Sequence, residues 1–305
     1  MIYLDSAATT LQKPPTVYRA VRSAMATMTS PGRGTYGPAA RASRTLLACR
    51  EAAAALFQVD QPEQVVLTDR TLDKAVALAE ELDCDIAMDN DAVAREAKFI
   101  FLGVKPQMMA DMLAALAPTL EERGGGYVLV SMAAGLTIAR LEEMLGFPAP
   151  ILRIMPNTPA AIGEGMILYT ANERVAAADV EEFCDKMVGA GRFDALEERL
   201  IDAASSVSGC GPAFVYQFIE ALADGGVACG LPRAKAMEYA AQTLAGAAGM
   251  VLATGRHPGQ LKDEVCSPGG STIAGVYALE KGGLRAAVMS AVLESFEKNK
   301  ELGKQ

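Results

Sequence analysis

The sequence predicts an α/β domain built on an open parallel sheet with helices on both faces, followed by an all-α domain. Two observations carry this prediction. Between about Val65 and Asn172, short apolar segments alternate with segments of helical periodicity. From about Glu173 to Gln305, apolar residues recur at helical spacing with almost no strand signal. The chain therefore divides into an α/β part and a helical part.

The elements of the α/β part follow from short apolar runs and from helical spacing between them. Helices are expected over Leu72–Leu82, from Gln107 to about Ala117, and from Thr137. The expected strands are Val65–Thr68, Phe99–Val104, Tyr127–Ser131, Ile151–Met155 and Met166–Thr170.

Two helices of the helical part, Ala213–Cys229 and Ala236–Ala253, carry apolar residues nearly all round. A helix without a polar face is buried, either in a large core or against a partner chain. We therefore expect an obligate dimer.

Composition and charge exclude several classes of function. The 305 residues carry 28 basic and 37 acidic side chains, whereas proteins that bind nucleic acid or anionic membranes lean the other way. No apolar run reaches the length of about 18 residues that a membrane span needs, and the first residues do not resemble a signal peptide. The six cysteines form no Cys-x-x-Cys pair, and His257 is the only histidine. We expect no metal site, reduced thiols and a cytoplasmic protein; His257, in a polar turn, is a poor base for a Ser-His-Asp hydrolase.

Two loops of the α/β part, Gly103–Gln107 and Met132–Gly135, begin where predicted strands end. The carboxyl ends of parallel strands are where such sheets bind ligands. Lys105 could meet a phosphate there, or it could be the solvated lysine of an ordinary turn. The small residues of the second loop could let a flat ring approach the backbone, or they could serve packing alone.

Two further loops, Ser205–Pro212 and Cys266–Thr272, open helices of the helical part. Pro212 suits a first helical position, and the exposed N–H groups and positive dipole end of a helix form a carboxylate site. Either loop alone could be a Ser/Thr cap, but two in one domain favour ligand binding. They contain no acid–base pair, which fits a reaction whose hard step a cofactor performs, such as hydride transfer.

Three motifs in this order resemble pyrroline-5-carboxylate reductases: Arg153–Pro159, Ser208–Pro212, and Leu261–Asp263 leading into Ser267–Thr272. The resemblance covers about residues 68–305, with Cys210 where the family has a serine. That family reduces a cyclic imine with NAD(P)H in the last step of proline synthesis. The resemblance implies a Rossmann-like dinucleotide-binding domain over residues 69–172. It also implies a helical domain over residues 173–305 that binds substrate and forms a homodimer or a higher homo-oligomer.

The resemblance also implies residue roles. Thr272, the candidate catalytic residue, would hydrogen-bond near the ring nitrogen, and Asn157 would lie where substrate and nicotinamide meet. Arg70 would favour the 2′-phosphate of NADPH, whereas Asp69 would suit the free ribose hydroxyl of NADH. The other candidate substrate-binding residues are Ser208, Gly209, Cys210, Gly211, Ser267, Gly269, Gly270 and Ser271. The candidate cofactor-binding residues are Asp69, Arg70, Thr71, Asn90, Val104, Lys105, Pro106, Ala133, Ala134 and Gly135.

Residues 1–68 depart from that family, which should begin with a strand followed by Gly-x-Gly-x-x-Gly. Ile2–Thr10 and the later part of this segment instead resemble the start of a class V aminotransferase or cysteine desulfurase. The lysine-bearing region of those enzymes is missing, so we expect no pyridoxal phosphate. The chain resembles a chimera with a seam near Thr68.

The missing glycine loop should weaken the cofactor site and leave the sheet without its middle strand. Two or three lost charge-assisted hydrogen bonds, at about 1.5–3 kcal/mol each, would lower cofactor affinity by about two to six orders of magnitude. Ile2–Leu4 could fill the vacant position beside Phe99–Gly103. The leading hypothesis is an imine reductase with impaired cofactor binding, and the alternative is a dimeric binding protein that keeps the proline-like pocket without the chemistry. A pyridoxal phosphate enzyme and a 2-hydroxy-acid dehydrogenase are weaker hypotheses.

Overall fold

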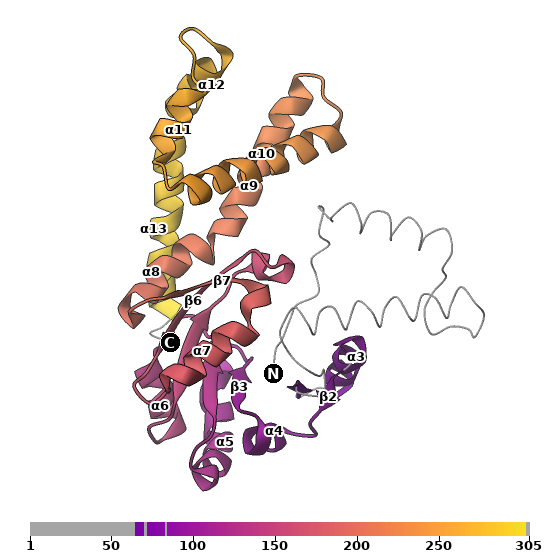
Figure 1. Ribbon diagram of the computed structural model, residues 1–305, viewed down its shortest axis with the longest axis vertical. Coiled ribbons are helices and arrows are strands. Elements are labelled where there is room, and N and C mark those ends of the chain that lie inside the picture. The colour runs from indigo at the N-terminus through magenta and orange to yellow at the C-terminus, as the bar shows by residue number, and fades with distance from the viewer. Residues whose placement is uncertain (1–64, 70–71, 83, 303–305) are drawn as a thin grey trace, which may run out of the picture. The chain divides into compact units, whose positions relative to one another are not determined.

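The computed structural model describes residues 65–69, 72–82 and 84–302. The chain divides into two compact units: the first contains the described residues up to Asp202 together with Glu301 and Leu302, and the second spans Ala203–Lys300. In Figure 1 the strands belong to the first unit, whereas the second consists of helices. The predicted order, an α/β domain followed by a helical one, is confirmed.

A five-stranded sheet forms the centre of the first unit, in the spatial order β3-β4-β5-β6-β7. The first three strands run parallel, and β6 and β7 are parallel to each other. The strands are β3 (Phe99–Leu102), β4 (Val128–Ser131), β5 (Ile151–Met155), β6 (Gly165–Ala171) and β7 (Gly191–Ala195).

The sheet differs from the prediction at β6, which pairs antiparallel with β5. The segment between these strands holds only the short 3-10 helix η3 (Thr158–Ile162). A parallel pair needs a longer crossover, usually through an α-helix, so this short connection returns the chain antiparallel. The prediction of a wholly parallel sheet is therefore wrong at this pair.

The sheet also continues into the segment where we expected helices alone. β7 lies beyond residue 172, and the compact unit that contains it extends to Asp202. Phe193 is the only large apolar residue in the Gly191–Ala195 strand, and most of this outer strand is not buried. An edge strand of this kind lacks the apolar run that reveals a strand in a sequence.

Both faces of the sheet are covered, as predicted, because successive residues of each strand point to opposite sides. On one face Leu129 and Ile151 pack with Leu113 of α5 and Leu141 of α6. On the other face the apolar residues of β3, β4 and β5 pack with Phe183 of α7. The helices concerned are α5 (Met109–Arg123), α6 (Ile138–Leu145) and α7 (Ala177–Lys186).

Helix α5 extends past the predicted end near Ala117: it contains Pro118 and ends at Arg123, where Gly124 caps it in the left-handed conformation. Leu116, Thr119 and Leu120, on both sides of this proline, are buried. Burial on both sides stabilises the helix enough to offset the missing N–H of the proline.

A second, two-stranded sheet pairs β1 (Val66–Leu67) in parallel with β2 (Asp85–Ile86), and α3 (Leu72–Leu82) lies between them in sequence. Within the described part of the chain, no strand joins this sheet to β3. The expected absence of a middle strand stays a prediction, because residues 1–64 lie outside the described residues. Ile2–Leu4, the segment predicted to fill that position, lies outside the described residues.

The second unit has little core of its own. Its core cluster contains Ala223, Ala236 and Ala240, where α9 and α10 pack together. The helices that lie wholly or partly in this unit are α8 (Glu198–Ser208), α9 (Gly211–Ala228), α10 (Arg233–Thr254), α11 (Pro258–Glu264), α12 (Ser271–Lys281) and α13 (Leu284–Leu302). None of the helices in the described ranges is long and apolar enough to cross a membrane.

Candidate functional site

The carboxyl ends of β3, β4 and β5 lie at one edge of the sheet. Leu102, the last residue of β3, pairs with Ser131, the last residue of β4, whereas β5 continues past the Ser131–Arg153 pair to Met155. The loops that follow β3 and β4 therefore start side by side. This edge brings together the predicted cofactor-binding segments Val104–Pro106 and Ala133–Gly135. A ligand bound by a sheet of this type lies at such an edge.

The loop after β4 is a tight turn of small residues. The Ala133 N–H donates to Ser131 Oγ at 3.3 Å, which turns the chain directly after the strand. Gly135 is buried and has a φ of 76°, a conformation that other residues rarely adopt. Thr137 then caps α6, because its Oγ1 accepts from the Arg140 N–H at 3.2 Å. These contacts hold a backbone of small residues at the sheet edge.

The loop after β3 supplies an exposed cation. Lys105 precedes the 3-10 helix η2 (Pro106–Met108), and its side chain is exposed. A Cβ added at Gly103 would meet no atom within 4 Å, so there is open space above the loop. The arrangement fits the predicted contact between Lys105 and a phosphate group.

The remaining predicted cofactor residues follow the small sheet. Asp69 comes after β1, and Asn90 begins α4 (Asn90–Glu96) after β2; both are exposed. Because β1 and β2 are parallel, these two residues follow the same edge of that sheet. Asp89 caps α4 through a 2.8 Å hydrogen bond from the Ala92 N–H. Arg70 and Thr71 lie outside the described residues.

Asn157 follows β5 at the same edge as the two cofactor loops. Its Oδ1 accepts from the Met166 N–H at 2.9 Å, and its backbone oxygen accepts from the Ala160 N–H at 3.1 Å. The side chain thus fastens the turn between β5 and β6. This placement is compatible with a position near the nicotinamide.

The predicted substrate loop at Ser208–Pro212 joins α8 to α9. The Ser205 carbonyl oxygen accepts from the N–H groups of Gly209 at 2.7 Å and of Cys210 at 3.1 Å. A Cβ at Gly209 would lie only 2.8 Å from this oxygen, so the turn requires glycine. Helix α9 starts at Gly211 without a side-chain cap. Pro212 has no N–H and the Ala213 N–H donates to the Cys210 carbonyl oxygen at 3.1 Å, so the first turn of α9 leaves fewer N–H groups for a carboxylate than an ordinary helix start.

The second predicted substrate loop, Ser267–Thr272, is also a glycine-containing turn that leads into a helix without a side-chain cap. The Gly270 N–H donates to the Ser267 oxygen at 3.0 Å, and Gly269 has a φ of 69°. A Cβ at Gly270 would overlap the side chain of Ser267. Helix α12 begins at Ser271 without a side-chain cap, and Thr272 is exposed in its first turn. Two helices of the second unit thus start with N–H groups that a ligand could occupy.

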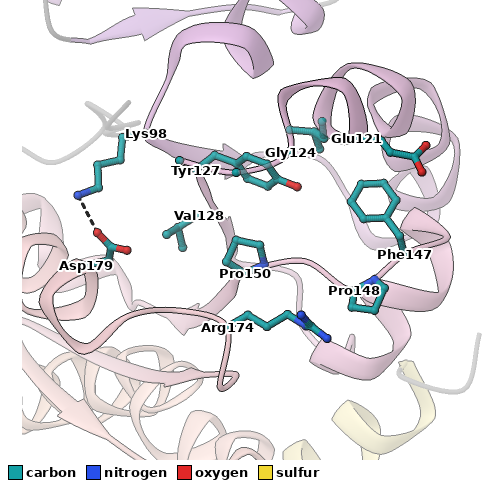
Figure 2. A pocket seen from close by; sticks show the side chains of 13 residues that line it. Lys98, Glu121, Gly124, Tyr127, Val128, Phe147, Pro148, Pro150, Arg174 and Asp179 are labelled. Carbon is teal, nitrogen blue, oxygen red and sulfur yellow. Dashed lines mark ion pairs between the residues drawn. The ribbon is translucent and has the colours of Figure 1, made fainter.

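A pocket of about 650 Å³ lies at the opposite, amino-terminal ends of the parallel strands (Figure 2). Val128 begins β4 there, and Lys98, which precedes β3, forms an ion pair of 2.7 Å with Asp179. Hydrogen bonds to Asp179 and Glu182 raise the pKa of Lys98, and burial raises the pKa of Tyr127. None of the predicted site residues lines this pocket, so it is separate from the edge described above.

Sequence reasoning assigned no role to the charge cluster around the buried Arg153. The side chain of Arg153 on β5 is 1% exposed, and its guanidinium pairs with Glu198 at 3.3 Å and with Asp202 at 2.8 Å. The Arg153 Nε is buried without a hydrogen-bond partner in the described structure. The sequence feature that could have revealed this cluster is an arginine within the otherwise apolar strand Ile151–Met155. A charged side chain inside such a strand is buried and therefore requires charged or polar partners.

Comparisons with known proteins agree on one family. The family model "Pyrroline-5-carboxylate reductase dimerisation" matches residues 198–302, and "NADP oxidoreductase coenzyme F420-dependent" matches residues 47–135. The pyrroline-5-carboxylate reductase of Escherichia coli K12 is 41% identical over 243 residues, which cover 80% of this chain and 89% of that protein. The one from Pisum sativum is 39% identical over 241 residues, covering 79% and 87%.

Solved structures give the same result. The Plasmodium falciparum pyrroline carboxylate reductase, with NADP bound, is 33% identical with a TM-score of 0.71, covering 85% of this chain and 94% of that one. The Coxiella burnetii reductase is 30% identical with a TM-score of 0.75, covering 85% and 96%. The oxidoreductase model begins at residue 47, inside the segment expected to resemble an aminotransferase. That expected resemblance is not supported, and residues 1–64 lie outside the described structure.

Proposed function

Because the chain belongs to the pyrroline-5-carboxylate reductase family, we propose that its sheet edge binds NADPH and its two glycine-rich loops bind the imine substrate. The reaction is the reduction of 1-pyrroline-5-carboxylate to L-proline. One observation carries the proposal: the cofactor segments Val104–Pro106 and Ala133–Gly135 follow neighbouring parallel strands at one edge. The two uncapped helix starts support the substrate part.

The chemistry requires little of the protein beyond binding and orientation. When bound, the dihydronicotinamide supplies a hydride to the imine carbon, and the ring nitrogen carries the proton that completes the amine. In the proposal, the first N–H groups of α9 and α12 bind the substrate carboxylate. Thr272 hydrogen-bonds near the ring nitrogen and keeps the imine oriented. Asn157 limits the space where ring and nicotinamide meet. Positioning of this kind contributes to rate without a dedicated base.

NADPH is preferred over NADH in this proposal. Lys105 is an exposed cation at the sheet edge. Arg70 follows β1 in the sequence, and an arginine at this point of a dinucleotide-binding domain could bind the 2′-phosphate of NADPH. The Plasmodium falciparum relative contains NADP, which supports the same choice. Lys105→Ala should weaken NADPH binding more than NADH binding if Lys105 contacts the 2′-phosphate, and equally if it contacts the pyrophosphate.

The protein acts as a homodimer in this proposal. The match to a dimerisation model covers the helical unit, and large apolar side chains of that unit are exposed in the single chain. Leu252 is 75% exposed, Tyr277 71% and Met289 65%. Burying such residues against a second copy would stabilise the assembly. Analytical ultracentrifugation should give a dimer or a multiple of it, and a monomer at micromolar concentration would contradict the proposal. We also propose that the protein is cytoplasmic.

The proposal is tested by titrating NADPH into the purified protein, following the cofactor fluorescence, and then adding pyrroline-5-carboxylate. Binding with turnover supports the reductase. The separation of β1 and β2 from the main sheet in the described residues favours a second candidate, a dimer that takes up proline without binding NADPH. Failure to bind NADPH, in a folded protein that still binds proline, would select that candidate. Thr272→Ala should lower kcat while leaving the NADPH Kd unchanged.

A further inference from the structure

The cluster around Arg153 joins three elements of the first unit. Arg153 comes from β5, and its two partners, Glu198 and Asp202, lie one turn apart on α8. Glu198 makes a further contact, because its Oε1 accepts from the Ile138 N–H at 2.7 Å. Ile138 is the first residue of α6. One carboxylate oxygen therefore links β5, α6 and α8.

The contact with α6 places this link next to the cofactor loop. Ala133–Gly135 precedes Thr137, the N-cap of α6. An anionic group at a helix N-terminus is favoured by the helix dipole and by the unpaired N–H groups. Glu198 therefore holds the start of the helix into which this loop runs.

The other end of α8 leads directly into the substrate loop. The helix ends at Ser208, and the Ser205 carbonyl oxygen accepts from the N–H groups of Gly209 and Cys210. In addition, Asn299 Nδ2 donates to the hydroxyls of Ser205 and Ser206 at 3.2 Å. The last turn of α8 thus has its own contacts, while Arg153 holds the first turns of α8 by pairing with Glu198 and Asp202.

We propose that Arg153 and Glu198 are positioning residues that couple the cofactor loop before α6 to the substrate loop after α8. This rests on the proposed function of those loops. A buried ion pair adds little net stability compared with apolar residues of similar size, so stability alone does not account for an arginine inside an apolar strand. Its planar guanidinium can instead hold two carboxylates of one helix in fixed geometry.

The test uses Glu198, whose side chain is 30% exposed, because removing Arg153 could prevent folding. Glu198→Ala removes the acceptor, whereas Glu198→Gln keeps an oxygen at the same place. Glu197→Ala is the matched control: Glu197 is the adjacent glutamate, is 67% exposed, and pairs with Arg199 on the surface. Glu198→Ala should raise both the NADPH Kd and the KM for pyrroline-5-carboxylate about ten-fold. The kcat should fall less than about three-fold.

Glu198→Gln should restore both constants to within about three-fold, and Glu197→Ala should leave them unchanged. A purely structural role would lower the melting temperature of Glu198→Ala without changing the NADPH Kd or the KM. That result would overturn the proposal, as would a glutamine variant as impaired as the alanine variant.

Amide hydrogen exchange without ligands separates this proposal from the proposed function. Glu198→Ala should accelerate exchange at residues 133–138 and also at residues 208–211, and Glu197→Ala should accelerate neither. Faster exchange at both segments supports the coupling even if the unsubstituted protein fails to bind NADPH, which would refute the reductase proposal alone. Acceleration at one segment only, or at neither, would overturn the coupling.

Discussion

Gly209→Ala should disrupt the substrate loop while leaving the rest of the helical unit intact. The added Cβ would lie 2.8 Å from the Ser205 carbonyl oxygen, whereas ordinary contact begins at 3.4 Å, so the loop must move by about half an ångström. That carbonyl accepts the N–H groups of both Gly209 and Cys210. Each neutral hydrogen bond contributes about 1 kcal/mol, so weakening both costs about 2 kcal/mol, or about thirty-fold in kcat/KM.

The assay is steady-state reduction of pyrroline-5-carboxylate at saturating NADPH, with urea unfolding measured in parallel. Gly225→Ala serves as the control, since Gly225 is exposed in α9 and its Cβ would meet no atom within 4 Å. This control should keep kcat/KM within about two-fold and raise the free energy of unfolding by about 0.5–1 kcal/mol. If Gly209→Ala also keeps kcat/KM within about two-fold, the loop relaxes freely and the reasoning is refuted.

Three other substitutions test the first unit. Gly191→Ala should lower the free energy of unfolding by about 3 kcal/mol, because its methyl group would overlap the Gly165 backbone at a φ of 134°; an unchanged urea midpoint would contradict this. Arg153→Met should lower it by about 1–3 kcal/mol, since two carboxylates that are 30% and 28% exposed lose their buried partner, and an unchanged urea midpoint would argue against it. Asp179 and Glu182 raise the pKa of Lys98 above 10.5, so the stability from Lys98 is present below about pH 10 and is lost as the pH rises through the folded-state pKa. Melting curves of Lys98→Met above about pH 9 should therefore show a shallower alkaline decline than those of the unsubstituted protein.

The elements with strong local patterns were predictable. Ile151–Met155 and Leu72–Leu82 have the predicted bounds, because apolar runs and helical spacing are properties of neighbouring residues. The loops that begin at Gly103 and Met132 were predictable for the same reason, since each follows a recognisable strand. Their convergence at one edge also followed, because parallel strands point their carboxyl ends the same way.

The elements that depend on distant residues were not predictable. β7 forms at the outer edge of the sheet through pairing with β6. Helix α5 runs through Pro118 since burial on both sides of this residue outweighs its local effect. In both cases a tertiary contact decided against the local signal. The reversal between β5 and β6, by contrast, could have been predicted, because the connection between these strands is too short for a parallel crossover.

The sequence by itself singled out the loops that we propose for the site, at residues 103–106, 133–135, 208–212 and 267–272. The tertiary structure alone decided which residues hold β5, α6 and the start of α8 together. Arg153, Glu198 and Ile138 are far apart in the chain, yet they meet at one carboxylate oxygen. The physical reason is that a buried charge can be paired by any partner the fold brings near it, and only the packed sheet and helices specify that partner.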